Sequence, residues 1–322
     1  MRKDRGVIAR LQYAGLRLFT SILYMFPIEW NLRTARLIGR IWWHAIPRHR
    51  ERARSHLRLA YGDGLSDREV DRVALRSMQH LVMMVFEAAF APRLIDEWTW
   101  SRYVKPVGIQ AALEVLLQGK GALLLTGHFG NWELAGYLLA TYGFDVVAVM
   151  RPLDNLYINR FVVNTRRRRG LRLLDKKGAS AQAEDVIRSG AALGFIADQN
   201  AGRKGLFVDF FGRKASTYKS IGLLAMATQV PIIIGYARRT GDSFFYEVGV
   251  QRIIYPHEWR DRDDPLRWIT QEYTAAIEAF VRDCPEQYLW IHRRWRSRPK
   301  EELTAAMRPS RPLAVDAGAG PT

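Results

Sequence analysis

Residues 121–136, which read GALLLTGHFGNWELAG, contain the side chains best suited to chemistry. An apolar run, Ala122 to Leu125, leads into Thr126-Gly127 and then His128, and Glu133 follows five positions later in a segment with helical character. An imidazole at a strand-to-helix turn acts as a general base when a carboxylate fixes its tautomer and stabilises its charged form. We therefore predict that His128 is a general base and that Glu133 orients it.

The alternative is a buried structural histidine with an incidental glutamate nearby. Gly127 and Gly130 flank His128, and residues without side chains leave room for a substrate to approach the imidazole. This favours a catalytic role.

Two more polar residues follow strand-like segments. Arg151 comes directly after Val146–Met150, and Asp198 comes directly after Ala191–Ala197. In open α/β sheets, sites gather beyond the carboxyl ends of the strands. The positions of Arg151 and Asp198 therefore predict that both meet His128 in a catalytic pocket.

Basic residues form two further patterns. Arg166–Arg169 is a block of four arginines before Gly170, either a solvated helix end or a phosphate clamp, because guanidinium forks match phosphate oxygens. Residues 202–219 alternate cations with bulky rings, a pattern that suits a ligand with an anionic head and an apolar tail, or a loop lying on lipid.

The composition sets limits on the class of protein. The chain has 322 residues, 48% of them hydrophobic, which is enough for one large domain or two smaller ones. Its one cysteine, Cys284, cannot form an internal disulfide, and no Cys/His cluster has zinc spacing, so we expect no metal and no cofactor. Walker, G-x-G-x-x-G and G-x-S-x-G motifs are absent from the sequence.

The net charge of +17 is uneven. Residues 1–60 hold thirteen Lys and Arg against three acids, a local charge of +10, interleaved with tryptophan and tyrosine. This mixture suits an anionic bilayer surface, and it also suits nucleic acid. Nucleic-acid binding gives no reason for a histidine and a carboxylate at a strand end, so we expect no nucleic-acid partner.

The N-terminal apolar run extends from Leu18 to Ile28. It has eleven residues, whereas a membrane span needs about 20. We predict a tilted or interfacial membrane helix within residues 1–30. A secretory signal and an ordinary amphipathic core helix are the alternatives.

The pattern along the chain is helical first and then α/β. Residues 31–91 read as helices, with a break at Gly62-Asp63-Gly64, a cap at Ser66 and an end before Pro92. After Pro106, helices and strands alternate, which predicts a sheet with helices on both faces. The predicted strands are Ala122–Leu125, Val146–Met150, Leu171–Leu174, Ala191–Ala197, Pro231–Tyr236 and Phe244–Gln251. The predicted helices are Ile109–Leu117, Trp132–Tyr142, Leu156–Arg168, Ala181–Arg188, Lys219–Thr228 and Pro265–Asp283.

A series of motifs runs along the chain in this order: GHFGNWE, the MRP that contains Arg151, RRRRG, FIADQN, VDFFG, TYKS and EQYLWIHRRWRSRP. Together they resemble the bacterial lipid A biosynthesis late acyltransferases, and the resemblance extends from about residue 7 to 300. The resemblance implies an α/β fold with a mixed β-sheet flanked by helices, as in glycerol-3-phosphate acyltransferases. It also implies a position on the cytoplasmic face of the inner membrane. The wider group often has Asp where this chain has Glu133, and either carboxylate can orient an imidazole. The domains we expect are a membrane-associated helix (1–30), an acyltransferase domain (31–300) and a disordered tail (301–322).

The resemblance also implies the site and its partners. The donor is an acyl thioester of acyl carrier protein or of coenzyme A, and the acceptor is a phosphorylated glycolipid, a lipid A precursor. The catalytic residues are His128, Glu133, Arg151 and Asp198, and from the same motifs we assign substrate binding to Gly127, Asn131, Arg166, Arg169, Lys219 and Arg294.

In this mechanism His128 deprotonates an acceptor hydroxyl that attacks the thioester. A backbone N–H at the start of the following helix, or Arg151, holds the oxyanion. Two alternatives stay open: a different lipid acceptor (a lysophospholipid, a phosphoinositol glycolipid or an aminolipid) and a catalytically silent membrane scaffold.

Overall fold

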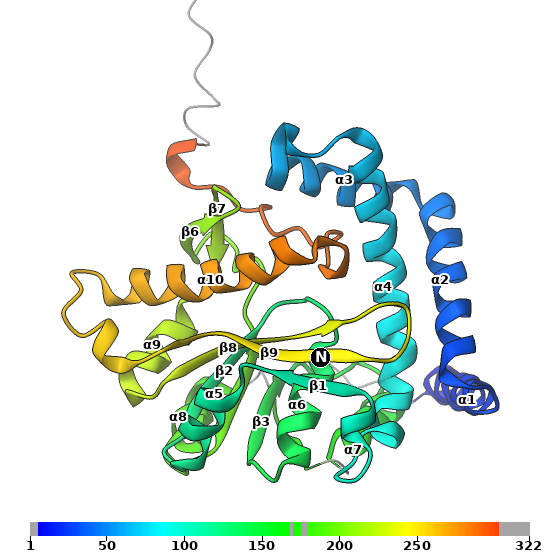
Figure 1. Ribbon diagram of the computed structural model, residues 1–322, viewed down its shortest axis with the longest axis horizontal. Helices are drawn as coiled ribbons and strands as arrows, with labels where there is room; N and C mark the ends of the chain where they lie inside the picture. The colour runs from blue at the N-terminus through cyan, green and yellow to red at the C-terminus, as the bar shows by residue number, and fades with distance from the viewer. Residues whose placement is uncertain (1–5, 168–169, 176–178, 303–322) are drawn as a thin grey trace, which may run out of the picture.

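The computed structural model describes residues 6–167, 170–175 and 179–302. The chain begins with four helices, α1 (Val7–Tyr24), α2 (Ile28–Ala45), α3 (Pro47–Tyr61) and α4 (Asp67–Leu94). Helices α2 and α4 lie side by side along one flank of the molecule, with α3 at one end of the pair and α1 at the other (Figure 1). Among the described residues, no helix combines the length and the apolar character that a bilayer span requires.

Local sequence explains where these helices begin and end. Pro47 lies at the first position of α3, where its missing N–H costs nothing. Ser66 caps α4 in a capping box, because its hydroxyl accepts the Glu69 N–H and the Glu69 carboxylate accepts the Ser66 N–H at 2.8 Å. The predicted cap is confirmed. The predicted end before Pro92 is wrong: α4 continues to Leu94, since a proline in the last turn removes only one hydrogen bond.

Within the described residues, seven strands form one mixed sheet. Neighbouring strands are parallel, except for the antiparallel pair β8–β9. In spatial order the strands are β1 (Val104–Val107), β9 (Tyr246–Ile254), β8 (Ile232–Arg239), β2 (Ala122–Thr126), β5 (Ala192–Ile196), β3 (Val146–Met150) and β4 (Arg172–Asp175).

Successive side chains of β2 point to opposite faces of the sheet and show what packs on each face. Leu123 and Leu125 belong to the main core with residues of α8 (Ala179–Arg188), α9 (Lys219–Thr228) and α10 (Pro265–Asp283). Ala122 faces the other way, toward α5 (Gln110–Leu117). Helices α6 (Trp132–Thr141) and α7 (Leu156–Arg167) complete the helical part. The predicted α/β class is confirmed, and each predicted strand and helix of this part is present with its ends within three residues.

Three strands were not predicted: β1, and the strands β6 (Leu206–Phe210) and β7 (Arg213–Thr217), which form a separate hairpin. The hairpin turn has positive φ at Phe211 (54°) and Gly212 (67°), as a two-residue turn between strands requires. Phenylalanine is a rare choice at such a position, so the sequence carries no turn signal there. Packing of Phe211 against Tyr61 and Trp290 holds it in place.

A buried ion pair ties α4 to the sheet and to α6. Glu87 of α4 is 0% exposed, and its Oε1 lies 2.5 Å from Nη1 of Arg239 at the end of β8. The other carboxylate oxygen accepts hydrogen bonds from the Tyr246 hydroxyl and, at 3.1 Å, from Nδ2 of Asn131. The Asn131 side chain in turn accepts the Leu134 N–H at 3.1 Å, which caps α6. Glu87 therefore fixes the start of α6 through its hydrogen bond with Asn131.

We expect Glu87→Ala to lower the free energy of unfolding by about 3 to 5 kcal/mol, because it leaves the Arg239 charge buried without its partner. Chemical denaturation would measure the change. The matched control is Glu184→Ala, which breaks the exposed Glu184–Arg188 pair on α8 and is expected to cost less than about 1 kcal/mol. Equal losses in the two variants would contradict the role given to the buried pair.

Candidate active site

His128 and Asp198 meet because β2 and β5 are parallel neighbours in register. Thr126 is paired with Ile196 at the ends of the two strands, so the residues two positions further on emerge at the same edge. Nδ1–H of His128 donates to Oδ1 of Asp198 at 2.7 Å, and the His128 backbone N–H donates to Oδ2 at 2.9 Å. Asp198, at 2% exposure, therefore holds both the ring and the backbone of His128.

The two groups shift each other's proton affinity in opposite directions. Burial lowers the pKa of His128, but the charge of Asp198 and its hydrogen bond outweigh burial and leave this pKa above its ordinary value. Burial raises the pKa of Asp198, yet His128, through its charge and two hydrogen bonds, brings that pKa well below the usual range. Asp198 is thus a carboxylate at neutral pH, and His128 gains basicity from it.

Three other side chains lie around the His128 ring, one of them at Nε2. Nε2 of Gln199 lies 3.3 Å from Nε2 of His128. The Trp132 ring packs edge-on against the imidazole, with centroids 5.1 Å apart, and the His292 ring stacks on it at 6.1 Å. Burial, together with the charges of His128 and Arg294, lowers the pKa of His292 to about 4 despite the opposing effect of Asp198. His292 is therefore neutral near pH 7.

Glu133 was predicted to orient His128, and the structure places it elsewhere. Its carboxylate forms a two-point ion pair with Arg166 of α7, where the Arg166 Nε donates to Oε2 at 2.9 Å and Nη2 donates to Oε1. The reason is local: α6 begins only at Trp132, so the five-residue spacing from His128 to Glu133 does not run along one helix. Asp198 occupies the position against Nδ1 instead.

The glycines beside His128 accommodate protein atoms rather than leaving room for substrate. Gly130 has φ +55°, and a Cβ there would lie 1.8 Å from the Ala237 carbonyl oxygen. A Cβ on Gly127 would lie 3.1 Å from Cγ2 of Ile277 and 3.5 Å from Oδ2 of Asp198. Both positions hold the turn close to the sheet and to the Asp198 carboxylate.

Two residues assigned to substrate binding are buried beneath the site. Asn131 is 1% exposed and joins Glu87 to the cap of α6. Arg294 is also 1% exposed, and it donates to the Ser216 carbonyl at 2.5 Å, to Oγ1 of Thr217 at 2.7 Å and to the Gln199 carbonyl at 3.3 Å. The contacts of both side chains support the loops that carry His128 and Gln199.

The structure places the other predicted residues at a distance from the His128 ring or outside the described residues. The Arg166 guanidinium is occupied by Glu133, so it is not an open phosphate clamp. The Arg151 side chain is 69% exposed, 3.9 Å from Asp154, at the wall of a cavity described below. Lys219 is an exposed residue at the start of α9. Arg169 lies outside the described residues, as does most of the predicted tail from 301.

A cavity of about 710 Å³ lies against the α5 and α6 side of the sheet, and its lining is mainly apolar. Its volume is in the range of about 300 to 1,000 Å³ that is usual for ligand sites. Residues of β5, β8 and β9 contribute Gly194, Gly235 and Gly249 to its wall, and α1 contributes Leu16 and Phe19. Trp132 also lines this cavity, so the same ring touches both the cavity and His128.

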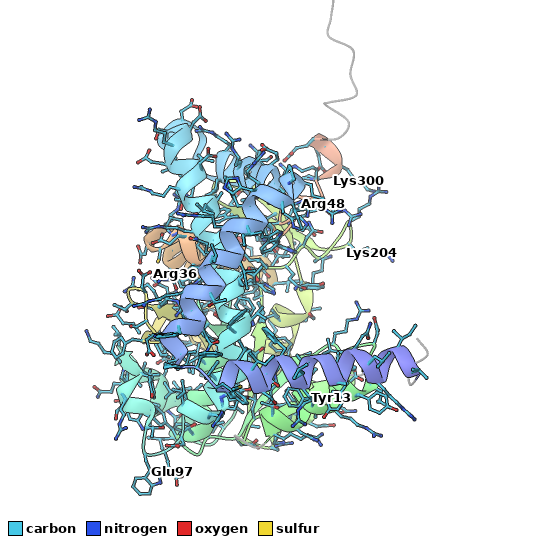
Figure 2. The ribbon with its side chains drawn as sticks, turned by 90° about the vertical axis from the view of Figure 1, so that its right-hand side faces the viewer. Tyr13, Arg36, Arg48, Glu97, Lys204 and Lys300 are labelled. Atoms are coloured by element: carbon cyan, nitrogen blue, oxygen red, sulfur yellow. The ribbon has the colours of Figure 1, made fainter. Side chains whose placement is uncertain are left out.

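Cations from α3 and the C-terminal segment gather around His56. His56 of α3 contacts the Trp290 carbonyl through Nδ1 at 2.7 Å, and Arg52 and Arg48 precede it at one-turn spacing on the same helix face. Burial, and then the charges of Arg293 and Arg48, lower the pKa of Arg52, as expected for neighbouring cations. In the part of the chain that the structure describes, none of the three arginines forms an ion pair. Figure 2 shows Arg48 on the same side of the molecule as Lys204 and Lys300.

Sequence reasoning did not select Trp132, Gln199 or His292. These three residues lie in the motifs GHFGNWE, FIADQN and EQYLWIHRRW, respectively. Each is directly beside a predicted site residue or two positions from one. The described ranges contain no group of three or more His, Cys, Asp or Glu side chains that could hold a metal ion.

Comparison with known proteins agrees over nearly the whole chain. The family model for bacterial lipid A biosynthesis acyltransferases matches residues 7–297. A lipid A biosynthesis lauroyltransferase of Escherichia coli (strain K12) is 24% identical over 300 residues, 90% of this chain and 92% of that protein. A lipid A biosynthesis myristoyltransferase of the same organism is 26% identical and covers 79% of this chain and 77% of its own. A phosphatidylinositol mannoside acyltransferase of Mycolicibacterium smegmatis (strain ATCC 700084 / mc(2)155) is 24% identical over 68% of this chain and 71% of its own.

We expect Asp198→Asn to lower the pKa of His128, because burial then acts on the imidazole without the opposing charge. Histidine-labelled protein followed by NMR across a pH series would measure the shift. The matched control is Glu133→Gln, which removes a carboxylate that is paired with Arg166 and is expected to leave this titration in place. A shift in Glu133→Gln and none in Asp198→Asn would restore Glu133 as the orienting acid.

Proposed function

Because the chain belongs to the bacterial lipid A biosynthesis acyltransferase family and is an acyltransferase, we propose a specific reaction for it. The protein moves a fatty acyl chain from an acyl thioester to a hydroxyl of a lipid A precursor, and His128 is the general base. The main support for the proposal is the hydrogen-bonded pair of His128 and Asp198. The His128 ring contacts the Trp132 side chain, which also lines a large apolar cavity.

The pair suits general-base chemistry. With Nδ1–H donated to Asp198, neutral His128 presents the lone pair of Nε2 to an acceptor hydroxyl. The imidazole takes the hydroxyl proton while the oxygen attacks the thioester carbonyl carbon, and Asp198 stabilises the imidazolium that forms. The carbon–sulfur bond then breaks, and the imidazolium returns its proton to the leaving thiolate. No covalent enzyme intermediate is needed.

The apolar cavity is the proposed site of the acyl chain. An apolar tail gains about 0.8 kcal/mol for each methylene removed from water, and the glycines of β5, β8 and β9 keep the cavity wall open. Acyl carrier protein or coenzyme A would present the thioester carbonyl at the Trp132 end, next to His128.

The arginines on α3 and Arg293 favour an anionic acceptor. Arg52 lies close to Arg48 and to Arg293, which follows His292 in the chain, and the His292 ring stacks on His128. Guanidinium groups bind phosphate oxygens well. A phosphorylated glycolipid such as a lipid A precursor fits this charge. A phosphoinositol glycolipid is the second candidate, because one relative is named as a phosphatidylinositol mannoside acyltransferase.

We expect purified protein in detergent to acylate a lipid A precursor, and His128→Ala to lose about 10²- to 10⁴-fold in rate, because the hydroxyl proton then has no acceptor. The assay would follow labelled acyl chains from acyl carrier protein and from coenzyme A. Lysophospholipids and a phosphatidylinositol mannoside would be offered alongside the lipid A precursor.

The matched control for this assay is His257→Ala, an exposed histidine that stacks on Tyr255. Its activity should equal that of the unmodified chain. Transfer only to another lipid would replace the acceptor while leaving the chemistry in place, and full activity in His128→Ala would remove the base assignment.

The proposal includes a position on a membrane surface, near the cytoplasmic face of the inner membrane. Helix α1 exposes Ile8, Leu11, Leu18 and Ile22 at helical spacing, and α2 adds exposed apolar side chains that include Trp30 at 59% exposure. Helix α1 crosses one side of the molecule in Figure 2, where Tyr13 is labelled. Other side chains of this helix line the apolar cavity, so lipid tails would have a short path from a bilayer to the acyl site.

We expect Leu11→Glu with Leu18→Glu to weaken binding to vesicles of mixed zwitterionic and anionic lipid at least tenfold, since each buried leucine contributes about 1.5 to 3 kcal/mol. Co-sedimentation would measure the partition. The matched control is Leu223→Glu on α9, an exposed leucine on the opposite side of the sheet, which should bind as the unmodified chain does. Unchanged binding of the double variant would exclude α1 as the membrane contact.

A further inference from the structure

A tetrahedral intermediate of acyl transfer places a negative charge on the former carbonyl oxygen, and that oxygen needs an N–H donor held in position. Three backbone donors close to His128 in the chain are already committed. The His128 N–H donates to Asp198, the Gly130 N–H donates to the Gln287 carbonyl at 3.0 Å, and the Asn131 N–H donates to the Ala237 carbonyl at 2.9 Å. Arg151, the other donor expected from sequence, extends into solvent beside Asp154.

The Gln199 side chain is the donor that the geometry places at the reacting nitrogen. Its Nε2 lies 3.3 Å from Nε2 of His128. Because Nδ1 of His128 gives its proton to the Asp198 carboxylate, Nε2 of the neutral ring is an acceptor. The amide must therefore turn its NH₂ group, and not its oxygen, toward the imidazole.

When an acceptor hydroxyl binds to His128, its O–H donates to the Nε2 lone pair in place of the Gln199 N–H. The Gln199 N–H is then free to donate to another acceptor. The thioester carbon under attack then lies next to the hydroxyl oxygen, with its own carbonyl oxygen one bond further on. The released amide N–H, 3.3 Å from Nε2 in the free protein, would then be within reach of that oxygen. The same N–H thus satisfies Nε2 in the free protein and is available to the oxyanion once the substrates are bound.

Partly buried contacts hold the Gln199 backbone in place. The Gln199 carbonyl accepts a hydrogen bond from Arg294, and the next residue, Asn200, donates its backbone N–H to Nε2 of His292 at 3.3 Å. The Asn200 side chain also donates to the Arg294 carbonyl at 3.1 Å. These contacts fix the backbone that carries the amide, which limits the reorganisation needed when negative charge develops.

We propose that the Gln199 side-chain amide donates the hydrogen bond that stabilises the oxyanion of acyl transfer. The hydroxyl oxygen bonds to the thioester carbon, and the carbonyl electron pair moves onto oxygen, where it accepts the Gln199 N–H. The pair then reforms the C=O bond as the carbon–sulfur bond breaks and the thiolate takes the proton from His128. This step rests on the acyl-transfer function proposed above.

The test compares Gln199→Ala and Gln199→Glu with the unmodified chain in two reactions: transfer to a lipid A precursor, and hydrolysis of the acyl thioester by water with no acceptor present. We expect kcat to fall about 10²- to 10³-fold in both reactions, with little change in KM, because both pass through the same oxyanion. Gln199→Glu keeps the size of the side chain but replaces the donor with a carboxylate, so its loss should equal or exceed that of Gln199→Ala.

The matched control is Gln110→Ala, an exposed glutamine on α5 that should leave both reactions unchanged. Thermal unfolding would show that each Gln199 variant keeps its fold. The NMR titration of His128 should be unchanged in Gln199→Ala, which makes this variant the decisive one, whereas the carboxylate of Gln199→Glu should raise the pKa of His128. A rise in acceptor KM with hydrolysis intact would make Gln199 an acceptor-binding residue and overturn the proposal. Unchanged kcat in both variants would overturn it as well.

Experiments that contradict the proposed acyl transfer to lipid A would give a different pattern of results. If the unmodified chain transfers no acyl group to any lipid, the lipid A assignment fails, while thioester hydrolysis still decides the role of Gln199. If His128→Ala is fully active and Gln199→Ala is not, the base assignment fails and the oxyanion donor is supported.

Discussion

The register between β2 and β5 is the constraint on which the site depends. His128 and Asp198 are 70 residues apart, and they meet because Ala122 pairs with Ala192 and the ladder continues in step to Thr126 and Ile196. A slip of one residue would turn each side chain of one strand to the other face of the sheet. Burial of Leu123, Leu125 and Leu193 in the main core prevents that slip. The packing of the core therefore sets the geometry of the proton transfer.

Charge within the protein interior serves the same geometry. Glu87 and Arg239 are nearly free of solvent, and their ion pair holds Asn131, which caps α6. The Glu133–Arg166 pair connects α6 to α7 at the cavity wall. Buried pairs of this kind contribute little net stability relative to apolar side chains, but they are costly to break. Here they fix the position of the helix that carries Trp132, the residue shared by the cavity and the His128 ring.

Strand-end reasoning could predict part of the site because it depends only on local pattern. His128 and Asp198 follow apolar strands, and parallel strands bring their carboxyl ends together. The pairing of those residues needed the strand order, with β5 beside β2, which the sequence pattern does not contain. Glu133 appeared closer in sequence, but α6 starts too late to place it beside His128. The β6–β7 hairpin was missed because Phe211 takes a backbone conformation that its residue type does not signal.

The arrangement of titratable groups leaves one proton acceptor at the centre of the site. Asp198 keeps its negative charge because its pKa lies well below the usual range, and His292 stays neutral because its pKa is lowered to about 4. His80, whose Nε2 contacts the Gly130 carbonyl at 3.1 Å, is also neutral, since burial lowers its pKa to about 3. Of these four groups, His128 alone has a pKa raised by its surroundings. A proton taken from an acceptor therefore has a single place to go, and Asp198 makes that place more basic without competing for the proton itself.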